Sequence, residues 1–550
     1  MRLGDFLVAY LRKLGVEVLF GIPGDLVLKL FFRLGARQGL RVVTFSHEPG
    51  VGFAVDGYAR ATGRIGVACV TYGAGGHNMV NAVAGSFSER VPILVISGGP
   101  GEEERRLGTL IHHQAKDIES QFHIYNEVTS AAKIIDNAAT AARDIDEVVR
   151  TMWTEQRPGY IEIHRDMVDR SVPVPAELIE WDGRLSFPRS DEQKLREAVA
   201  DAAARWNASK RPVMVLGIET HRYRLTKEVV ALAEKMGAPV LTSVLAKGAF
   251  PMDHPLHMGV LIGPISPRAI CERVARADLV LNLGSQPTDI DLGMSPPQIE
   301  RQRTIRAADN QVDISLHTYT DVNLRQFVKA LSRARLRRHR EKVVYSDNLK
   351  AQSRGTQRAI QVADVLWEVN RFLTRHDGFM VVAESGDMLF AGLDVRVPGR
   401  ANYFAQGYYA SMGFGVPAAL GAQIGTGRRP LLLCGDGAFQ MTGTEIAHSP
   451  RHGCNPIVVL MNNGGWQIFR PVSERRDLLG IPPWPYAEMA RGFGGWGKRV
   501  ETVQVLRDAL EEAQAQDKFA LLEVVVPPQD LSPISRKYIA ASARRARAGR

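Results

Sequence analysis

An aspartate between two glycines, Gly435-Asp436-Gly437, is the residue group in this sequence with the clearest chemical consequence. It ends the apolar run 429–437, and a second polar group, Asn462-Asn463, ends the apolar run 455–463. Such runs are typical of buried parallel strands, and open α/β sheets bind ligands beyond the carboxyl ends of their strands. We therefore expect the two groups to meet at one edge of a sheet.

The residue types at this edge predict a phosphate and a metal ion. Glycines let backbone N–H groups approach phosphate oxygens, and the N-terminus of the following helix attracts the same anion. An aspartate beside a phosphate needs a cation between them, and Mg²⁺ prefers carboxylate, amide and carbonyl oxygens. A plain structural turn is the alternative for the GDG group alone, but Asn463, 26 residues after Gly437, favours a Mg²⁺ site.

Nine apolar runs alternate with helix-like segments and predict an α/β protein with parallel sheets. The runs are 16–24, 64–73, 91–99, 211–219, 277–285, 378–385, 429–437, 455–463 and 519–528. The stretches 172–191 and 333–355 separate three expected domains, and the first and third resemble each other in their order of strand, glycine turn, helix and strand. The expected domains are 1–172, 192–332 and 356–535, followed by a basic tail, 536–550.

The chain has 550 residues and a formal charge of +10. Segment 333–342 carries a net +5 and the tail 536–550 a net +6, which leaves the remainder at about −1. Charge runs of this kind are usually solvated linkers and tails, so we expect no nucleic acid and no membrane as partners. Nucleic-acid binding through the tail is the alternative.

The cysteines and the N-terminal segment indicate the cellular compartment of the protein. The four cysteines form no CxxC pair, and three lie in or beside apolar runs, which is typical of a reducing compartment. The N-terminal segment reads as an amphipathic helix without a cleavage site, and no apolar stretch approaches about 18 residues. We expect a soluble, cytoplasmic protein.

The GDG and NN groups resemble the diphosphate-binding signature of the thiamine diphosphate-dependent enzymes. The resemblance covers the whole chain, including the order of pyrimidine-binding, middle and diphosphate-binding domains. It implies that thiamine diphosphate and Mg²⁺ are the cofactors. By this resemblance Asp436, Asn463 and the Gly465 carbonyl coordinate Mg²⁺, and Gly437 and Ala438 contact the diphosphate.

A carboxylate facing the aminopyrimidine is the second requirement of thiamine chemistry, because it helps the cofactor remove its own C2 proton. Glu48, in Ser46-His47-Glu48-Pro49-Gly50, matches the position of that glutamate in the family. Taken alone, Glu48 also fits an acid at a helix N-terminus.

Three further residues indicate the branch of the family. Asp25 follows the first apolar run in Ile22-Pro23-Gly24-Asp25, and His112 and His113 are adjacent. Adjacent side chains of an extended segment diverge, so we expect one histidine to face a substrate and the other to orient a neighbour; a surface or capping role is the alternative. With GDG and NN, these motifs resemble the 2-oxo acid decarboxylases. The stretches 70–86, 110–114, 408–418 and 435–443 resemble most of all the phenylpyruvate decarboxylases. The resemblance implies that Asp25, His112 and His113 handle protons and orient the substrate carboxylate.

Phe469 departs from the pattern of that family, since many members carry a glutamate there. A phenyl ring cannot exchange a proton. Either Asp25 and the histidines suffice for the proton transfers, or another group substitutes for the missing glutamate. The ring also makes this wall of the substrate pocket larger and apolar, which favours an aromatic substrate. We expect the substrate pocket to include Leu389, Trp466, Ile468 and Phe469.

Two cofactor contacts follow from the run Tyr408–Gly413. By resemblance, Met412 props the cofactor in its bent form and the Ala410 carbonyl accepts a hydrogen bond from its amine. Asp387 is also assigned to the cofactor site. Ordinary core or loop roles are the alternative for these residues.

Together these features predict non-oxidative decarboxylation of 2-oxo acids, especially phenylpyruvate and indole-3-pyruvate, to CO₂ and the aldehyde. The resemblance implies a homodimer or homotetramer with active sites at the subunit interface. One alternative is a thiamine diphosphate-dependent carboligase or lyase. Another is a catalytically idle partner or effector-binding subunit, which the missing acid at Phe469 motivates.

Overall fold

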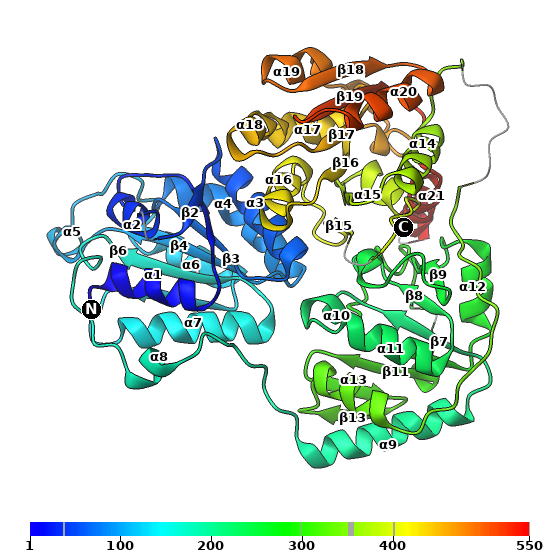
Figure 1. Ribbon diagram of the computed structural model, residues 1–550, viewed down its shortest axis with the longest axis horizontal. Coiled ribbons are helices and arrows are strands. Elements are labelled where there is room, and N and C mark those ends of the chain that lie inside the picture. The colour runs from blue at the N-terminus through cyan, green and yellow to red at the C-terminus, as the bar shows by residue number, and fades with distance from the viewer. Residues whose placement is uncertain (37–38, 298, 350–356, 400–401, 549–550) are drawn as a thin grey trace. The chain divides into compact units, whose positions relative to one another are not determined.

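Three β-sheets organise the chain in the computed structural model, which describes residues 1–36, 39–297, 299–349, 357–399 and 402–548 (Figure 1). They lie in two compact units. Unit 1, which holds one sheet, comprises Met1–Phe187, Val416–Gly427 and Thr442–Cys454. Unit 2, which holds two, comprises Pro188–Gly415, Arg428–Met441 and Asn455–Arg550. The predicted α/β class is confirmed, and all nine predicted strands form.

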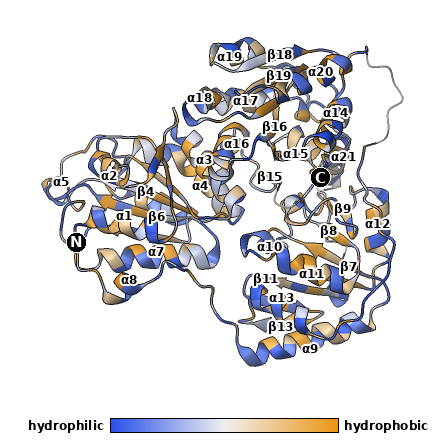
Figure 2. Ribbon diagram, viewed as in Figure 1, coloured by the Kyte–Doolittle hydropathy of each residue, from blue (hydrophilic) through white to orange (hydrophobic). Residues whose placement is uncertain are grey.

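The sheet of unit 1 is parallel throughout, in the order β2-β1-β3-β4-β6-β5. Its strands are β1 (Val18–Gly21), β2 (Arg41–Val43), β3 (Gly66–Val70), β4 (Ile93–Gly99), β5 (Ala131–Ile135) and β6 (Gly159–His164). Alternate residues of each strand enter two separate hydrophobic clusters, one on each face. Because both faces are covered, the central strands are continuous apolar runs (Figure 2).

Helices cover both faces of this sheet. One cluster contains residues of α1 (Leu3–Lys13), α2 (Leu28–Leu34) and α7 (Ala141–Glu155). The other contains residues of α3 (Glu48–Thr62), α4 (Ala74–Ser88) and α6 (Ser120–Val128). Unit 1 also includes α5 (Glu102–Leu107), α8 (Ala176–Glu180), α18 (Ser449–His452), the 3₁₀ helix η3 (Gly443–His448) and most of α16 (Gly415–Thr426).

The last sheet, in unit 2, repeats the topology of the first. Its order is β15-β14-β16-β17-β19-β18 and all its pairs are parallel, so each domain has its second, first, third, fourth, sixth and fifth strands side by side. The suspected similarity of the two domains is therefore confirmed at the level of topology. The strands are β14 (Met380–Ala383), β15 (Tyr403–Ala405), β16 (Pro430–Gly435), β17 (Ile457–Asn462), β18 (Trp496–Val500) and β19 (Ala520–Val525).

In the described part of this last domain there are six helices and two 3₁₀ helices. They are α14 (Val362–Arg375), α15 (Asp387–Gly392), α17 (Asp436–Thr442), α19 (Tyr486–Gly492), α20 (Val503–Gln514), α21 (Pro533–Ala548), η4 (Gln467–Phe469) and η5 (Arg476–Leu479). Residues of α14, α15, α20 and α21 pack with the strands in one large core.

The middle sheet, also in unit 2, is mixed, in the order β13-β12-β11-β10-β7-β8-β9. Strands β7 (Pro212–Leu216), β8 (Val240–Thr242), β9 (His257–Val260), β10 (Leu279–Leu283) and β11 (Thr304–Ala308) are parallel, and β12 (Gln311–Ile314) and β13 (His317–Thr320) add an antiparallel edge. The helical segments are α9 (Glu192–Ala208), α10 (Glu219–Arg222), α11 (Thr226–Met236), α12 (Arg268–Ala275), α13 (Leu324–Arg333), η1 (Lys247–Ala249) and η2 (Arg301–Arg303).

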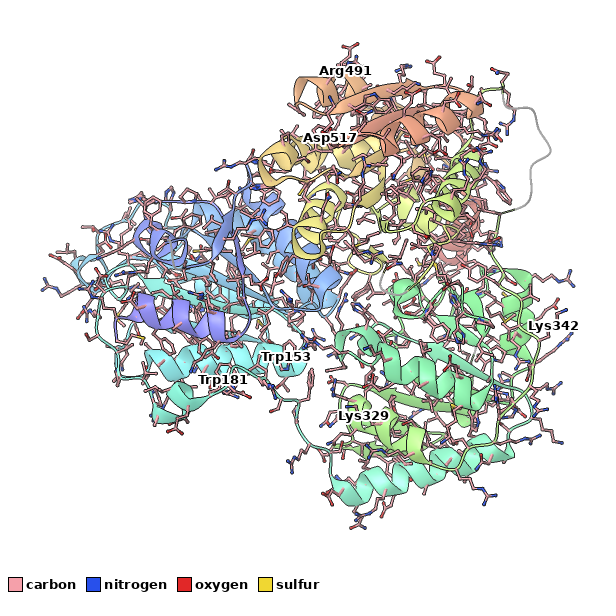
Figure 3. All side chains as sticks on the ribbon, in the orientation of Figure 1. Trp153, Trp181, Lys329, Lys342, Arg491 and Asp517 are labelled. Carbon is pink, nitrogen blue, oxygen red and sulfur yellow. The ribbon has the colours of Figure 1, made fainter. Side chains whose placement is uncertain are left out.

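The first predicted linker, 172–191, packs onto unit 1 for most of its length. The Trp181 ring lies 5.3 Å from that of Tyr10, and the Phe187 ring stacks 5.5 Å from that of Trp153 (Figure 3). Unit 1 therefore runs to Phe187 rather than ending at 172. The prolines of this stretch suggested a linker, whereas its aromatic side chains find partners on helices earlier in the chain.

The two basic segments are less solvated than their charge predicted. Within 333–342, His339 is 6% exposed and the Arg337 carbonyl accepts a hydrogen bond of 3.0 Å from Trp206 Nε1, although Lys342 is exposed (Figure 3). As far as Ala548, the expected tail belongs to α21, in which Ile539 is buried; residues 549–550 lie outside the described residues. His339 and the Arg337 carbonyl therefore hold the first segment against the protein, and Ile539 holds the second. Part of the linker, 350–355, lies outside the described residues.

Among the described residues, no helix has the length and apolar character needed to span a membrane.

Candidate functional site

The predicted meeting of Asp436 and Asn463 takes place at the carboxyl ends of β16 and β17, which pair in parallel. The Asp436 carboxylate accepts hydrogen bonds from the backbone N–H groups of Gly437, at 2.8 Å, Gly464, at 2.7 Å, and Gly465, at 3.0 Å. Gly464 and Gly465 have φ values of 76° and 138°, which side-chain-bearing residues rarely adopt. The glycines after Asn463 thus let the chain fold back around the carboxylate.

The amide of Asn463 lies against an oxygen of Asp436 and the carbonyl oxygen of Gly465. One end of the amide lies 3.2 Å from Asp436 Oδ1 and 2.9 Å from the Gly465 carbonyl oxygen. If nitrogen occupies that end, it donates to both oxygens; if oxygen does, three oxygens face one another and require a cation between them. Carboxylate, amide and carbonyl oxygens are the ligands that Mg²⁺ takes in proteins, so these three residues fit the ion.

Burial raises the pKa of Asp436 to about 6, although the hydrogen bonds from backbone N–H groups lower it. A bound cation favours the ionised form of a carboxylate, so an ion at this position would offset the cost of burying the charge.

The side of the turn at Gly437 is closed by Trp466. A Cβ at Gly437 would lie 2.6 Å from Trp466 Cδ1, so only glycine fits beneath the indole. The Trp466 backbone N–H donates to the Leu479 carbonyl at 2.9 Å, which holds the tryptophan over the turn. Ala438 is buried in the first turn of α17.

Trp466 and Phe469 flank this edge with exposed apolar surface. Trp466 is 39% exposed and Phe469, at the end of η4, is 54% exposed. Ile468 between them is partly buried against the core. Leu389, the fourth predicted pocket residue, is 2% exposed and packs within that core, so its role as pocket lining stays a prediction.

The loop from Ala410 to Gly415 is held by a buried acid that the sequence reasoning did not assign. Glu384 accepts hydrogen bonds from the backbone N–H groups of Gly415, at 2.6 Å, and Ser385, at 2.8 Å. Burial raises the pKa of Glu384 to about 7, although these and neighbouring N–H groups lower it. An acid at the end of the apolar run 378–385 was the available signal. Ala410 has a φ of 55°, and Met412 is partly exposed.

Asp387 makes different contacts from those expected of a cofactor ligand. Its carboxylate accepts hydrogen bonds from the Ser532 backbone N–H at 3.2 and 3.3 Å, immediately before α21. The carboxylate therefore holds the start of that helix in this structure.

In unit 1, Glu48 is the first residue of α3, and its Oε2 accepts a hydrogen bond of 3.0 Å from Asn78 Nδ2. The same turn is held by Glu445, which accepts from the Ser46 backbone N–H at 3.0 Å. A Cβ at Gly50 would meet the Glu445 carboxylate at 2.6 Å, so this contact requires glycine. The sequence reasoning missed Asn78 and Glu445 because neither lies near Glu48 in sequence.

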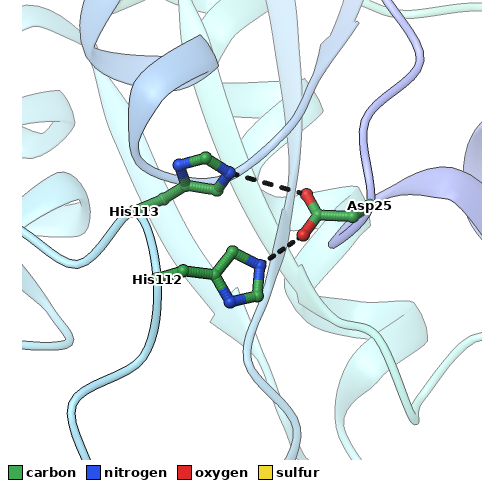
Figure 4. A group of neighbouring side chains, drawn as sticks. All are labelled: Asp25, His112 and His113. Atoms are coloured by element: carbon green, nitrogen blue, oxygen red, sulfur yellow. Dashed lines mark hydrogen bonds and ion pairs between the residues drawn. The ribbon is translucent and has the colours of Figure 1, made fainter.

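Asp25, His112 and His113 are brought together (Figure 4). His112 Nε2 contacts Asp25 Oδ2, and His113 Nε2 lies 3.8 Å from Asp25 Oδ1. The expectation that the two histidines diverge is wrong, because their segment is a turn: the Gln114 N–H donates to the Ile111 carbonyl at 3.1 Å, and His113 has a φ of 69°. A left-handed residue in the turn directs both rings to one carboxylate.

Asp25 remains acidic in this group. Partial burial raises its pKa, but the hydrogen bond with His112, the Leu26 N–H and the two histidine charges outweigh that effect and lower the pKa below its usual value. The three side chains are all exposed. A carboxylate that lies close to two imidazoles is a group suited to proton transfer.

Three family models match the chain in order. The N-terminal TPP binding domain of thiamine pyrophosphate enzymes matches residues 1–124, the central domain of these enzymes matches 199–334, and their C-terminal TPP binding domain matches 386–524.

The chain is also similar to named decarboxylases over nearly its full length. It is 36% identical over 547 residues to "Indole-3-pyruvate decarboxylase" of Azospirillum brasilense, with 98% of each chain covered. It is 30% identical over 536 residues to "Alpha-keto-acid decarboxylase" of Mycobacterium avium (strain 104), which covers 95% of this chain and 93% of the relative.

Proposed function

This chain belongs to the thiamine pyrophosphate (thiamine diphosphate)-dependent 2-oxo acid decarboxylases, and we propose that it acts on aromatic 2-oxo acids such as phenylpyruvate and indole-3-pyruvate, giving CO₂ and the aldehyde. The structural observation that supports thiamine diphosphate as the cofactor is the group formed by Asp436, Asn463 and the Gly465 carbonyl beside a glycine turn. The 36% identity to a relative named for indole-3-pyruvate supports the aromatic substrate.

The two ends of the cofactor are assigned to different sheets. Asp436, Asn463 and the Gly465 carbonyl would hold Mg²⁺, and the start of α17 at Gly437 would meet the diphosphate. Glu48, kept in place by Asn78, would meet the aminopyrimidine. When bound, thiamine diphosphate supplies the electron sink that the departing CO₂ requires.

Two residues of the 408–413 loop are proposed to complete the cofactor site. Ala410, in a left-handed conformation, would direct its carbonyl to the cofactor amine, and Met412 would support the bent form. The hydrogen bonds of Glu384 to the backbone at the end of this loop support a fixed conformation.

Asp25, His112 and His113 are proposed to move protons and to orient the substrate carboxylate. Their exposure leaves the group accessible to a substrate, and the shared carboxylate lets each imidazole exchange a proton. No acid stands at Phe469, so we assign the proton transfers to these three residues.

The exposed rings of Trp466 and Phe469 support an aromatic substrate. Each ring exposes apolar surface, which a substrate ring would remove from water. One methylene more or less in a hydrophobic pocket is already worth about 1–3 kcal/mol, or about 10–200-fold in kcat/KM.

A substrate panel tests this proposal. The enzyme, with thiamine diphosphate and Mg²⁺, is given phenylpyruvate, indole-3-pyruvate, benzoylformate, 4-methyl-2-oxopentanoate and pyruvate, while CO₂, aldehyde and hydroxyketone are measured. We expect kcat/KM for the first two to exceed that for pyruvate at least about tenfold, and Phe469→Ala to reduce this ratio, with Val472→Ala as the matched exposed control. Preference for pyruvate would refute the aromatic substrate, and a hydroxyketone as main product would indicate a carboligase.

We further propose an assembly of at least two copies, in which Glu48 and Asp436 of one active site come from different copies. The resemblance to the decarboxylases supports this arrangement. Glu48→Gln and Asp436→Ala should each inactivate the enzyme, whereas dissociating, mixing and reassembling the two should restore up to about one quarter of wild-type activity, because half of the random dimers contain one intact site. If mixing restores nothing, each site lies within one chain.

A reducing, cytoplasmic location is also proposed. It is supported by the four cysteines, Cys69, Cys271, Cys434 and Cys454, all of which are free thiols.

A further inference from the structure

The group of Asp25, His112 and His113 has the donor atoms of a transition-metal site as well as those of a proton-transfer site (Figure 4). Among the residues that the structure describes, it is the one group of three His, Cys, Asp or Glu side chains whose ligand atoms lie within 4.8 Å of one another. Two imidazole nitrogens and one carboxylate oxygen are a set that binds Zn²⁺ and related first-row metals.

The distances within the group suit one ion. Three atoms no more than 4.8 Å apart all lie within about 2.8 Å of a common point. Bonds from Zn²⁺ to histidine nitrogen and carboxylate oxygen are about 2.0–2.2 Å long, so shifts of about 0.7 Å bring all three atoms to bonding distance. Side-chain rotations of exposed residues supply shifts of this size.

The backbone already holds the ligands on one side. The turn at Ile111–Gln114 directs both rings to Asp25, and a Cβ on Gly73 would lie 2.0 Å from the His113 carbonyl oxygen, so the turn is packed directly against Gly73. Thr71 Oγ1 donates to Asp25 Oδ1 at 3.3 Å, which orients the carboxylate. Binding a metal therefore requires little additional ordering of the protein.

The two metal sites differ in the ions they prefer. The site at Asp436 offers only oxygen atoms, which suit Mg²⁺, whereas the site at Asp25 offers two nitrogens, which Mg²⁺ binds poorly and Zn²⁺ binds well. Mg²⁺ in excess therefore occupies the first site without competing strongly for the second.

We propose that Asp25, His112 and His113 form a second metal site, selective for Zn²⁺ and Co²⁺ over Mg²⁺, and that a metal bound there inhibits the enzyme. The inhibition rests on the proposed function, because an imidazole nitrogen that binds a metal cannot accept a proton. The binding itself depends only on the geometry of the three side chains.

Co²⁺ absorption tests the binding. Enzyme without an affinity tag, saturated with thiamine diphosphate and Mg²⁺, is titrated with Co²⁺, whose visible bands report nitrogen ligation. We expect one equivalent per chain, displaced by Zn²⁺, and binding at least about tenfold weaker in His113→Asn, since one of three ligands is lost. His123→Asn is the matched control, because His123 is an exposed histidine on α6. Absent bands, or equal affinity in His113→Asn, would overturn the site.

Activity tests the inhibition. With cofactor and Mg²⁺ saturating, Zn²⁺ should lower kcat over the concentration range in which it displaces Co²⁺, and a chelator followed by fresh Mg²⁺ should restore it. Full activity with Zn²⁺ bound would refute the inhibition. An enzyme that decarboxylates no 2-oxo acid before Zn²⁺ is added would contradict the proposed function instead, and the Co²⁺ titration would still decide the site.

Discussion

The backbone of His113 shows how single residues set this site. Its φ of 69° is a conformation that side-chain-bearing residues adopt at a cost of about 1 kcal/mol or more, and Ala410 shares it with a φ of 55°. Both are predicted site residues. Such strain persists where surrounding contacts impose it, as the packing of the His113 carbonyl on Gly73 does. At both positions the strained backbone directs a group that is predicted to take part in the site.

Replacing His113 tests its role in proton transfer. Asparagine tolerates the left-handed conformation but has no imidazole, so His113→Asn should keep the turn and lower kcat by about 10²–10⁴-fold. Steady-state kinetics with phenylpyruvate measures the change. His123→Asn should retain wild-type kcat, and an unchanged kcat in His113→Asn would remove that residue from the mechanism.

Replacing Asp436 tests the Mg²⁺ site. Asp436→Asn removes the charge that the ion requires while keeping the size of the side chain, so thiamine diphosphate with Mg²⁺ should no longer raise the unfolding temperature. In the wild type a ligand at 100 times its Kd stabilises by about 2.7 kcal/mol. Asp517→Asn, at an exposed aspartate labelled in Figure 3, is the control and should respond as the wild type does. An Asp436→Asn protein that is still stabilised would place the ion elsewhere.

At the scale of elements, helix α6 fixes the turn that carries the histidines. Gln121 on this helix is fully buried and accepts a hydrogen bond of 2.7 Å from the Gly73 backbone N–H. Its amide nitrogen donates to Ser97 Oγ at 2.9 Å on β4 and to the Tyr160 hydroxyl at 2.7 Å on β6. One side chain thus connects two strands, a helix and the glycine turn beneath His113.

Gln121→Met keeps the length of the side chain and removes all three hydrogen bonds. Leaving a buried polar group unpaired costs about 1–3 kcal/mol, so the unfolding temperature should fall. Because the turn is less fixed, kcat should fall more than KM rises, and Gln121→Glu, which still accepts from Gly73, should recover part of kcat. Gln193→Met, at an exposed position of α9, is the control. Lost stability with unchanged kcat would show that Gln121 has no positioning role.

At the scale of the whole molecule, the same sheet topology occurs in the first and the last domain. Within unit 2, a buried lysine connects the middle domain to the last domain. Lys247 on η1 is fully buried and donates to the carbonyls of Leu393, at 3.0 Å, and Val395, at 2.7 Å, after α15. Burial lowers the pKa of Lys247 to about 7, although Asp394 and Asp347 raise it. The contact therefore joins two sheets through a group that is easily deprotonated.

This lysine makes stability depend on pH with a definite sign. Between about pH 7 and 10.5 the unfolded lysine binds a proton that the folded one has lost, so its contribution to the free energy of unfolding rises with pH by up to about 5 kcal/mol. Unfolding temperatures of wild type and Lys247→Met, measured from pH 7 to 9.5, should differ progressively in favour of the wild type. Lys329→Met, at a half-exposed lysine labelled in Figure 3, is the control, and its difference from the wild type should not change with pH. If the difference between wild type and Lys247→Met does not change with pH either, Lys247 stays charged in the folded protein.

The amino-acid sequence determined the features that depend on near neighbours. Continuous apolar runs marked the nine strands, since a parallel strand covered on both faces needs apolar residues throughout. The GDG and NN groups placed Asp436 and Asn463 at one edge, because parallel strands end on the same side. Similarity to known motifs supplied the family and the candidate roles of Glu48 and Asp25.

The tertiary structure decided whatever depends on contacts between distant segments. The convergence of His112 and His113 follows from one left-handed residue and its packing on Gly73, which a rule for extended chains misses. Segment 172–191 was predicted to separate two domains, yet its aromatic side chains pack on helices of unit 1. The basic C-terminal segment was predicted to be solvated, yet its Ile539 is buried. Gln121 and Glu445 carry no local signal at all, because each acts on a backbone N–H group 48 or 399 residues away.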